Sequence, residues 1–316
     1  MNTYCGTGLA NPRNPRGLTL AWDHNVYVKN SFINWVVILE DFVFGHVLVI
    51  GNGFDLDLGL PTSYSQFLAS DEFVSLTAKH NKLAQYLEKK HLVQNWVDIE
   101  NELIIASKTN AADPLRNKPS DYLEEYKALR EALVQYIKKL EYKNLNEHSA
   151  AYCAFHKVCD RDSVCIVNFN YTETISVLLR YRFPDATHIQ IHGAAANGKI
   201  VFGVHDQADI KNEHVFLRKA VSSALYKKHF AGEFMRNASE SVSIFGHSLG
   251  NTDFTQFLPF FDLDQHEKSS KLDVYYHSES SYYDLYGNID LLTNNQLQRF
   301  SRQHEFKMIG PKMSGV

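Results

Sequence analysis

Four short groups of glycines and polar residues each follow an apolar run that reads as a buried strand. They are Gly51, Asn52 and Gly53 with Asp55; Asn170 with Thr172; His192; and Gly246 and Ser248 with Asp253. In an open parallel sheet, ligands gather at the carboxyl ends of the strands, where loops and helix N-termini converge. We therefore expect these four groups to line one shared ligand pocket.

The first group is a glycine turn that directly follows the run HVLVI. Glycines allow positive φ and a close approach of the backbone, so the amides of Gly51 and Gly53 can cradle a phosphate. The six-residue dinucleotide fingerprint needs a third glycine where Leu56 stands, which excludes an ordinary dehydrogenase turn. The alternative is a tight strand-to-loop turn. We assign Asp55 to capping backbone amides or to a ribose hydroxyl, because a phosphate would repel it.

The second and third groups supply polar side chains of different kinds. The carboxamide of Asn170 both donates and accepts hydrogen bonds, which suits gripping a ribose or positioning a water. His192 ends the next strand, and imidazole is the side chain best able to move a proton near neutral pH. A structural role is the alternative for a single histidine at a strand end. Asn170 and His192 are the candidate catalytic residues.

The fourth group has a second interpretation. The run GHSLG at 246–250 matches the G-x-S-x-G nucleophile elbow, which would make Ser248 an acyl-transfer nucleophile. Three histidines follow it: His266, His277 and His304. However, the residues at 251–254 are not the small ones that the helix of an elbow uses, and we find no oxyanion-hole loop. An esterase that uses Ser248 stays as an alternative.

The composition restricts the class of protein. With 316 residues, 44% of them hydrophobic, the chain can bury a full core, and its net charge of −4 offers no general attraction to nucleic acid. No cluster of acidic residues and lysines at a strand end resembles a two-metal nuclease site, so we expect neither nucleic acid nor metal. The four cysteines contain no C-x-x-C pair, and no segment is apolar and long enough to cross a bilayer. We expect a cytoplasmic protein with no membrane contact.

The chain alternates between strands and helices from residue 46 onward. Seven runs rich in β-branched and aromatic residues predict strands, at 46–51, 163–169, 187–193, 199–204, 241–246, 272–277 and 304–310. Their spacing leaves room for crossover helices, so we expect an α/β fold with an open, mostly parallel sheet.

Between the first two strands lies a long helical stretch. Ser63 and Gln66 form a plausible capping box, and residues 121–142 combine strong helix formers with apolar residues at helical spacing. We expect residues 46–316 to form a single domain with a helical insertion at about 65–160. Residues 1–45 show no clear period, and we expect a peripheral, poorly ordered extension there.

Several spaced motifs together resemble a known family. They are IGNGFDLDLGLPTSYSQF, NWVDIENEL, NFNYT, IHG, VFGV and GHSLGNTD, in that order. The order is similar to that of the AbiH family, bacterial proteins linked to abortive infection by bacteriophages. The resemblance covers about residues 46–255, leaves out the first 45 residues and covers the last sixty only loosely. It implies an anti-phage role.

The same series is more distantly similar to sirtuin-type NAD-binding proteins, which implies a Rossmann-like (sirtuin-like) fold. In those proteins the first turn folds over the diphosphate and the nicotinamide ribose. The resemblance implies that Gly51, Asn52 and Gly53 line the diphosphate, that Asn170 holds the ribose and a water, and that His192 is the base. Gly246 and Ser248 would contact the adenosine side, and Asp253 would fix a loop or a ribose. Thr172 stands where that family has Asp, and the four-cysteine zinc module is absent.

These expectations combine into one functional hypothesis. NAD is the expected substrate or ligand, with no further cofactor required, and the expected reaction is hydrolysis of the nicotinamide–ribose bond by an NAD glycohydrolase. The alternative is a sensor that binds a nucleotide without turnover. A phage-derived trigger and further copies of the chain are the candidate partners. Trp96, Asp98 and Glu100 would form a lid or regulatory surface, or else a solvated amphipathic face with Trp96 buried.

Overall fold

The computed structural model describes most of the chain. The described residues are 43–93, 98–109, 119–180, 183, 185–222, 226, 230–264 and 269–311. They all belong to one compact unit, Phe42–Val316. The expected extension at 1–45 falls outside these ranges up to residue 42, and Trp96 and His266 fall outside them too.

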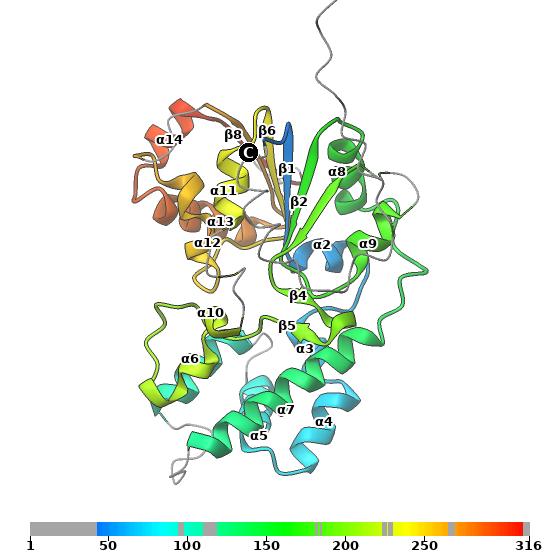
Figure 1. Ribbon diagram of the computed structural model, residues 1–316, viewed down its shortest axis with the longest axis vertical. Helices are drawn as coiled ribbons and strands as arrows, with labels where there is room; N and C mark the ends of the chain where they lie inside the picture. Colours follow the sequence, from blue (N-terminus) through cyan, green and yellow to red (C-terminus); the bar gives the residue numbers. More distant parts are fainter. Residues whose placement is uncertain are drawn as a thin grey trace, which may run out of the picture. The chain divides into compact units, whose positions relative to one another are not determined.

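A six-stranded parallel sheet lies at the centre of the fold (Figure 1). Its strands are β1 (His46–Ile50), β2 (Val164–Asn168), β3 (Thr187–Gln190), β6 (Ser241–Phe245), β7 (Lys271–Tyr275) and β8 (Glu305–Ile309). Their order across the sheet is β3-β2-β1-β6-β7-β8, which is 3-2-1-4-5-6 when these six are numbered along the chain. That order is the one of Rossmann-like doubly wound sheets. The predicted open α/β sheet is confirmed.

Helices cover both faces of the sheet, which is why β1, β2 and β6 are buried along their whole length and mostly apolar. Figure 1 shows α8 (Ala150–Cys159) and α9 (Thr174–Leu179) on one side. It shows α11 (Phe230–Arg236), α12 (Phe254–Phe261) and α13 (Glu279–Leu292) on the other. Leu48 and Phe155 belong to the core beneath α8. Two further helices are α2 (Asn52–Asp57), directly after β1, and α14 (Leu297–Gln303), before β8.

The strand expected at 199–204 is only partly present and does not join the main sheet. Its residues form β5 (Lys199–Ile200), which pairs antiparallel with β4 (Gly193–Ala194) in a separate ribbon. Gly193 has φ +71°, and a Cβ there would lie 2.3 Å from the Lys199 carbonyl oxygen. The chain therefore turns sharply after β3, and the expectation of a continuous strand at 199–204 was wrong.

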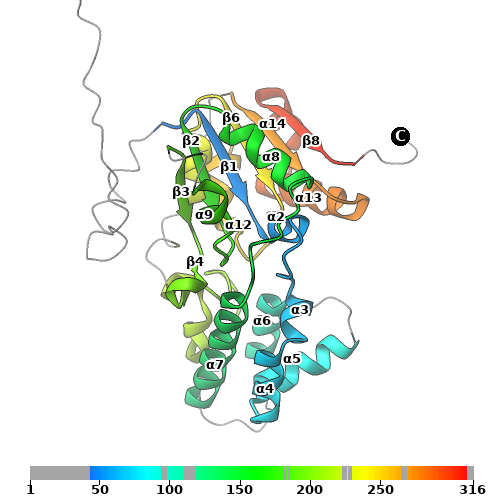
Figure 2. The same cartoon turned by 90° about the vertical axis from the view of Figure 1, so that its right-hand side faces the viewer.

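Five helices between β1 and β2 form a second layer beyond the carboxyl edge of the sheet (Figure 2). They are α3 (Tyr64–Leu68), α4 (Asp71–Ala78), α5 (Lys82–Val93), α6 (Ile99–Thr109) and α7 (Pro119–Lys138). The capping box of Ser63 and Gln66 is confirmed. The apolar pattern that follows it is split between α3 and α4, because Ser70 caps a new helix by accepting from the amide of Phe73.

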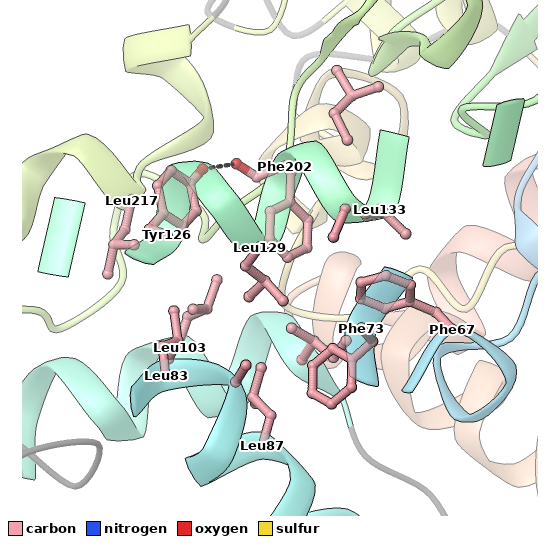
Figure 3. Packing of buried hydrophobic residues seen from close by; sticks show 14 of the residues in the cluster. Phe67, Phe73, Leu83, Leu87, Leu103, Tyr126, Leu129, Leu133, Phe202 and Leu217 are labelled. Atoms are coloured by element: carbon pink, nitrogen blue, oxygen red, sulfur yellow. Dashed lines mark hydrogen bonds between the residues drawn. The ribbon is translucent and has the colours of Figure 1, made fainter. Parts of the chain in front are cut away.

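This helical layer has its own hydrophobic core, which sequence patterns did not reveal as a shared one. Leu83, Leu103 and Leu129 pack in it against Phe202 and Leu217, which come from the chain after β3 (Figure 3). Tyr126 donates a hydrogen bond to the Phe202 carbonyl oxygen. The same stretch holds three short helices: η1 (Ala195–Asn197), η2 (Asn212–Leu217) and α10 (Lys219–Ser222). Two segments far apart in the sequence therefore build one helical core.

No helix within the described ranges is long and apolar enough to cross a bilayer.

Candidate functional site

The order of the strands reverses between β1 and β6, because β2 and β3 are added on one side of β1 and β6 lies on its other side. β1 and β6 are therefore neighbours in the sheet, although β2 and β3 come between them in the chain. In doubly wound sheets, ligands bind outside the carboxyl ends of the strands at this switch point. The turn Gly51–Gly53 follows β1, and the run Gly246–Ser248 follows β6. The first and fourth groups of polar residues therefore meet here, as expected.

The two glycine turns are packed directly against each other. The amide of Gly51 donates to the Phe245 carbonyl oxygen at 3.0 Å, and the amide of Gly53 donates to the Gly246 carbonyl oxygen at 2.8 Å. Gly246 has φ +68°, and a Cβ on it would lie 2.1 Å from the Phe54 nitrogen. These glycines thus allow two backbones to touch, and the amides that were expected to cradle a phosphate already have partners within the protein.

The second group joins the same turn. Asn170, 7% exposed, donates from Nδ2 to the Gly51 carbonyl oxygen at 3.1 Å. Thr172 donates from Oγ1 to Asp55 Oδ2 at 2.7 Å. In contrast, Asn52 is exposed and uses its Nδ2 on the Thr62 carbonyl oxygen. Asn170 and Thr172 therefore hold the β1 turn in place from the neighbouring strand.

Asp55 is enclosed by the protein rather than aimed at solvent. Its side chain is 0% exposed, and burial raises its pKa to about 6, although the hydrogen bonds from Thr172 and Thr174 oppose this rise. The carboxylate pairs with Thr172, a residue that the sequence marked as a departure from the sirtuin pattern. Thr172 therefore satisfies Oδ2 of Asp55 at the position where a ribose contact was expected.

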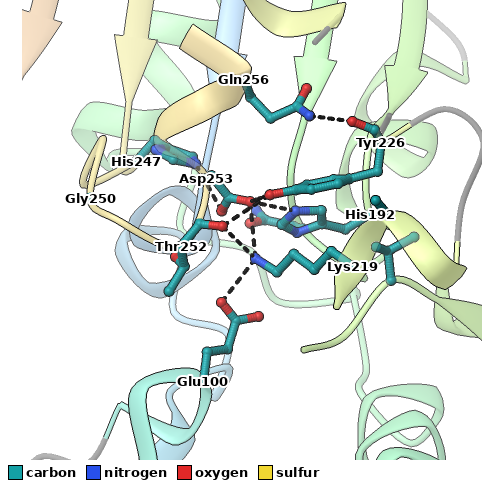
Figure 4. Close-up of polar contacts among 12 residues, drawn as sticks. Glu100, His192, Lys219, Tyr226, His247, Gly250, Thr252, Asp253 and Gln256 are labelled. Carbon is teal, nitrogen blue, oxygen red and sulfur yellow. Dashed lines mark hydrogen bonds and ion pairs between the residues drawn. The ribbon is translucent and has the colours of Figure 1, made fainter. Parts of the chain in front are cut away.

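His192 and Asp253 form a buried pair at the same edge of the sheet (Figure 4). His192 Nε2 lies 2.9 Å from Asp253 Oδ1, and the two residues are 5% and 6% exposed. Burial lowers the pKa of His192, although Asp253 opposes this effect. A neutral imidazole that donates from Nε2 keeps Nδ1 as an acceptor, and no described residue hydrogen-bonds to Nδ1. His192 therefore has the tautomer and the free nitrogen that a general base needs.

Aromatic rings hold the imidazole of His192 in place. Phe169 meets it edge to face at a centroid distance of 5.2 Å, and Tyr171 stacks on it at 5.8 Å. His247 lies against the same Phe169 ring at 4.4 Å and turns its Nε2 toward Asp253 Oδ2 at 3.7 Å. The packing leaves the ring of His192 little freedom to rotate.

Asp253 is the centre of a larger network. Its Oδ1 also accepts from Lys219 Nζ at 3.0 Å and from the Tyr226 hydroxyl at 3.1 Å. Lys219 in turn pairs with Glu100 Oε2 at 2.9 Å. Burial alone would raise the pKa of Asp253, yet Lys219 and His192 hold it well below its usual range. Burial alone would lower the pKa of Lys219, yet Asp253 and Glu100 raise it to about 12.

The members of this network come from two parts of the fold. His192 and Asp253 follow strands of the sheet, whereas Glu100 belongs to α6 in the helical layer. A family model described as bacteriophage abortive infection AbiH matches residues 47–276. The chain belongs to the AbiH family. The AbiH match includes every residue of the network and confirms the resemblance found in the sequence motifs, and it places the chain among phage abortive-infection defence proteins. A search of curated proteins returns no match.

Glu100 corrects one expectation for this AbiH chain. A solvated face was the alternative for Asp98 and Glu100, but Glu100 is only 6% exposed and points into the network. Asp98 begins α6 as a cap, with its Oδ1 accepting from the amides of Glu100 and Asn101. Lys219 and Tyr226 were missed altogether, because neither follows a strand of the sheet.

Ser248 does not have the geometry of a nucleophile elbow in this AbiH chain. An elbow places the serine itself on a strained turn between a strand and a helix. Here the positive φ values belong to Gly246 and Leu249, and α12 begins only at Phe254. Ser248 is exposed, and its Oγ accepts from the amide of Gly250. The esterase alternative therefore loses its structural basis.

Proposed function

We propose that this AbiH protein binds NAD or a related nucleotide at the switch point between β1 and β6 and hydrolyses the nicotinamide–ribose bond. The observation that carries the proposal is the His192–Asp253 pair, with Nδ1 of His192 free of described partners, at the carboxyl edge of a 3-2-1-4-5-6 sheet. Sheets of this order bind dinucleotides at that edge. Breakdown of NAD in an infected cell would starve phage replication, in line with the family's role in abortive infection.

The residues suit the chemistry of this reaction. Water attacks the ribose carbon, the carbon–nitrogen bond breaks, and its electron pair neutralises the cationic ring of the leaving nicotinamide. The leaving group therefore needs little acid assistance. The attack needs a base that takes the proton of the water and a ribose that is held in a fixed position. His192 would take the proton of the water on Nδ1, and Asp253 would stabilise the imidazolium that forms. Asn170 would set the position of the β1 turn under the ligand.

The direct test is to incubate the pure protein with NAD and to measure free nicotinamide. We expect His192→Gln to lose on the order of a hundredfold in rate or more, because it removes the base. His188→Gln is the matched control, because His188 lies on β3 and contacts Asn168 instead of Asp253. If His192→Gln consumed NAD at the parent rate, the proposed reaction would be wrong.

A second candidate is a nucleotide sensor without turnover, which position 172 favours. Thr172 stands where the sirtuin pattern has Asp, and it donates its hydroxyl to Asp55. Calorimetry would then show NAD binding while no nicotinamide appears over several hours. A phage-derived trigger belongs to both candidates, since either must be silent before infection.

A further inference from the structure

The network around Asp253 joins three separate parts of the chain. His192 follows β3, Asp253 precedes α12, and Lys219 begins α10, so the donors reach one carboxylate oxygen from different directions. Lys219 is 0% exposed and is fixed further by a contact of 3.3 Å to the Thr252 carbonyl oxygen. Its other carboxylate partner, Glu100, lies in the first turn of α6, which belongs to the helical core (Figure 4).

We propose that Lys219 and Glu100 are positioning residues: Lys219 shares the charge of Asp253 so that His192 stays a neutral base, and Glu100 makes this arrangement depend on the docking of helix α6. The inference rests on the proposed role of His192 as the base of the site. Through Glu100, the helical insertion would then directly influence the protonation of His192.

His192 and Lys219 both contact the same oxygen, Oδ1 of Asp253. A carboxylate with no other partner would stabilise a proton on the neighbouring imidazole, and His192 would then be charged and useless as a base. The Lys219 ammonium contacts the same Asp253 Oδ1 and opposes that proton. Glu100 does the reverse, because it takes up part of the charge of Lys219 on the other side. Removal of Lys219 and removal of Glu100 should therefore act on His192 in opposite directions.

Other titratable groups face this network and belong in the balance. Around His192 and Asp253 they are His247, Tyr64, Tyr171 and Tyr226; around Lys219 and Glu100 they are Asp98, Tyr126, His205 and Asp206. The tyrosines stay neutral, because burial raises the pKa of Tyr171 well above its usual value and does the same for Tyr226. Burial raises the pKa of Glu100, but the Lys219 ammonium at 2.9 Å opposes this rise. Lys219 and Glu100 therefore bring opposite charges to the same chain of contacts.

The test follows the imidazole of His192 by NMR in histidine-labelled protein, with its signal identified by its loss in His192→Gln. We expect Lys219→Met to raise the pKa of His192 by about one unit and Glu100→Gln to lower it. Lys219→Met with Glu100→Gln should bring it back toward the parent. Glu102→Gln is the matched control, because Glu102 lies on the same helix, is equally buried and pairs with Lys90 and Tyr86 instead.

Lys219→Met alone leaves two buried carboxylates without a cation and can fail to fold. The double variant keeps the net charge of the parent's cluster, and Glu100→Gln leaves Lys219 paired with Asp253, so both keep the test decisive. The inference is overturned if the His192 titration in Glu100→Gln matches that of the parent and of Glu102→Gln. If the titration shifts as expected while the parent itself releases no nicotinamide, the coupling of Lys219 and Glu100 to His192 stands and the proposed hydrolysis fails. If NAD is hydrolysed, the acid limb of the pH–rate profile must move to higher pH in Lys219→Met and to lower pH in Glu100→Gln.

Discussion

At the scale of single residues, the ionisation of the buried Asp55 should change stability. Its Oδ2 accepts from Thr172, whereas its Oδ1 is buried without a described partner. Because the folded pKa of about 6 lies above the ordinary value, the folded state binds a proton more tightly than the unfolded chain between about pH 4 and 6. The contribution of Asp55 to the free energy of unfolding should therefore fall as the pH rises through that window and then level off.

Asp55→Asn tests this directly. The variant lacks the buried charge, so at pH 7.5 its free energy of unfolding should exceed that of the parent by roughly 1–2 kcal/mol. Urea unfolding at several pH values measures the difference, which should vanish below about pH 4. Asp57→Asn is the control, because Asp57 is exposed and accepts from the amide of Ala151. A difference between Asp55→Asn and the parent that did not grow between pH 4 and 6 would contradict this account of Asp55.

The sequence allowed some of the site residues to be found but not their relations. His192 and Asp253 were recognised because each lies near a strand end, yet they are 61 positions apart and nothing local reveals that they pair. Lys219 carried no signal at all, since it follows no strand of the sheet and its partners Glu100 and Asp253 lie far from it in the chain. Sequence patterns and spacing predict local structure, whereas a buried ion pair depends on how elements that are distant in the chain pack together.

At the scale of elements, the contact between the β1 and β6 turns is the most demanding feature. Gly246→Ala would force a side chain onto a residue with φ +68° and press its Cβ against Phe54 and Gly53. We expect a loss of at least about 3 kcal/mol in the free energy of unfolding, from strain and overlap together. Thermal unfolding followed by circular dichroism measures it.

Gly287→Ala is the matched control with the opposite sign. Gly287 lies within α13, is exposed, and a Cβ there would meet no atom within 4 Å. Alanine is favoured over glycine inside a helix, so this variant should gain about 0.5–1 kcal/mol. If both variants lost stability equally, the special role of Gly246 would have to be given up.

Strands were easier to predict than the turns and helices around them. Five-residue runs such as HVLVI and SVSIF are buried on both faces, so their composition alone indicates central strands. The helix breaks were harder, because the break between α3 and α4 depends on Ser70 as a cap inside an apolar pattern. The shared helical core could not be predicted, because Phe202 and Leu217 come from a segment with no helical period of its own.

At the scale of the whole described molecule, the two cores differ in how they are held. The sheet core is continuous through the parallel strands β1, β2 and β6, which pair along their full length. The helical core depends on short helices and on residues from the chain after β3. The ion pair between Lys219 and Glu100 is one link from the helical core to the site. Opening of the helical core would therefore break this pair.

Leu129→Ala tests whether the helical core opens by itself. Leu129 is 0% exposed at the centre of that core, so its truncation should cost about 2–5 kcal/mol. If the core is a separate cooperative unit, amide hydrogen exchange in α5 and α7 should speed up by roughly 30-fold or more, while amides of β1 and β6 keep the parent rates. Leu48→Ala, in the sheet core, is the reciprocal variant and should accelerate exchange in both regions. Equal acceleration everywhere in Leu129→Ala would mean that α6 cannot leave Lys219 without loss of the sheet, and the buried site would then have to admit its ligand by a smaller motion.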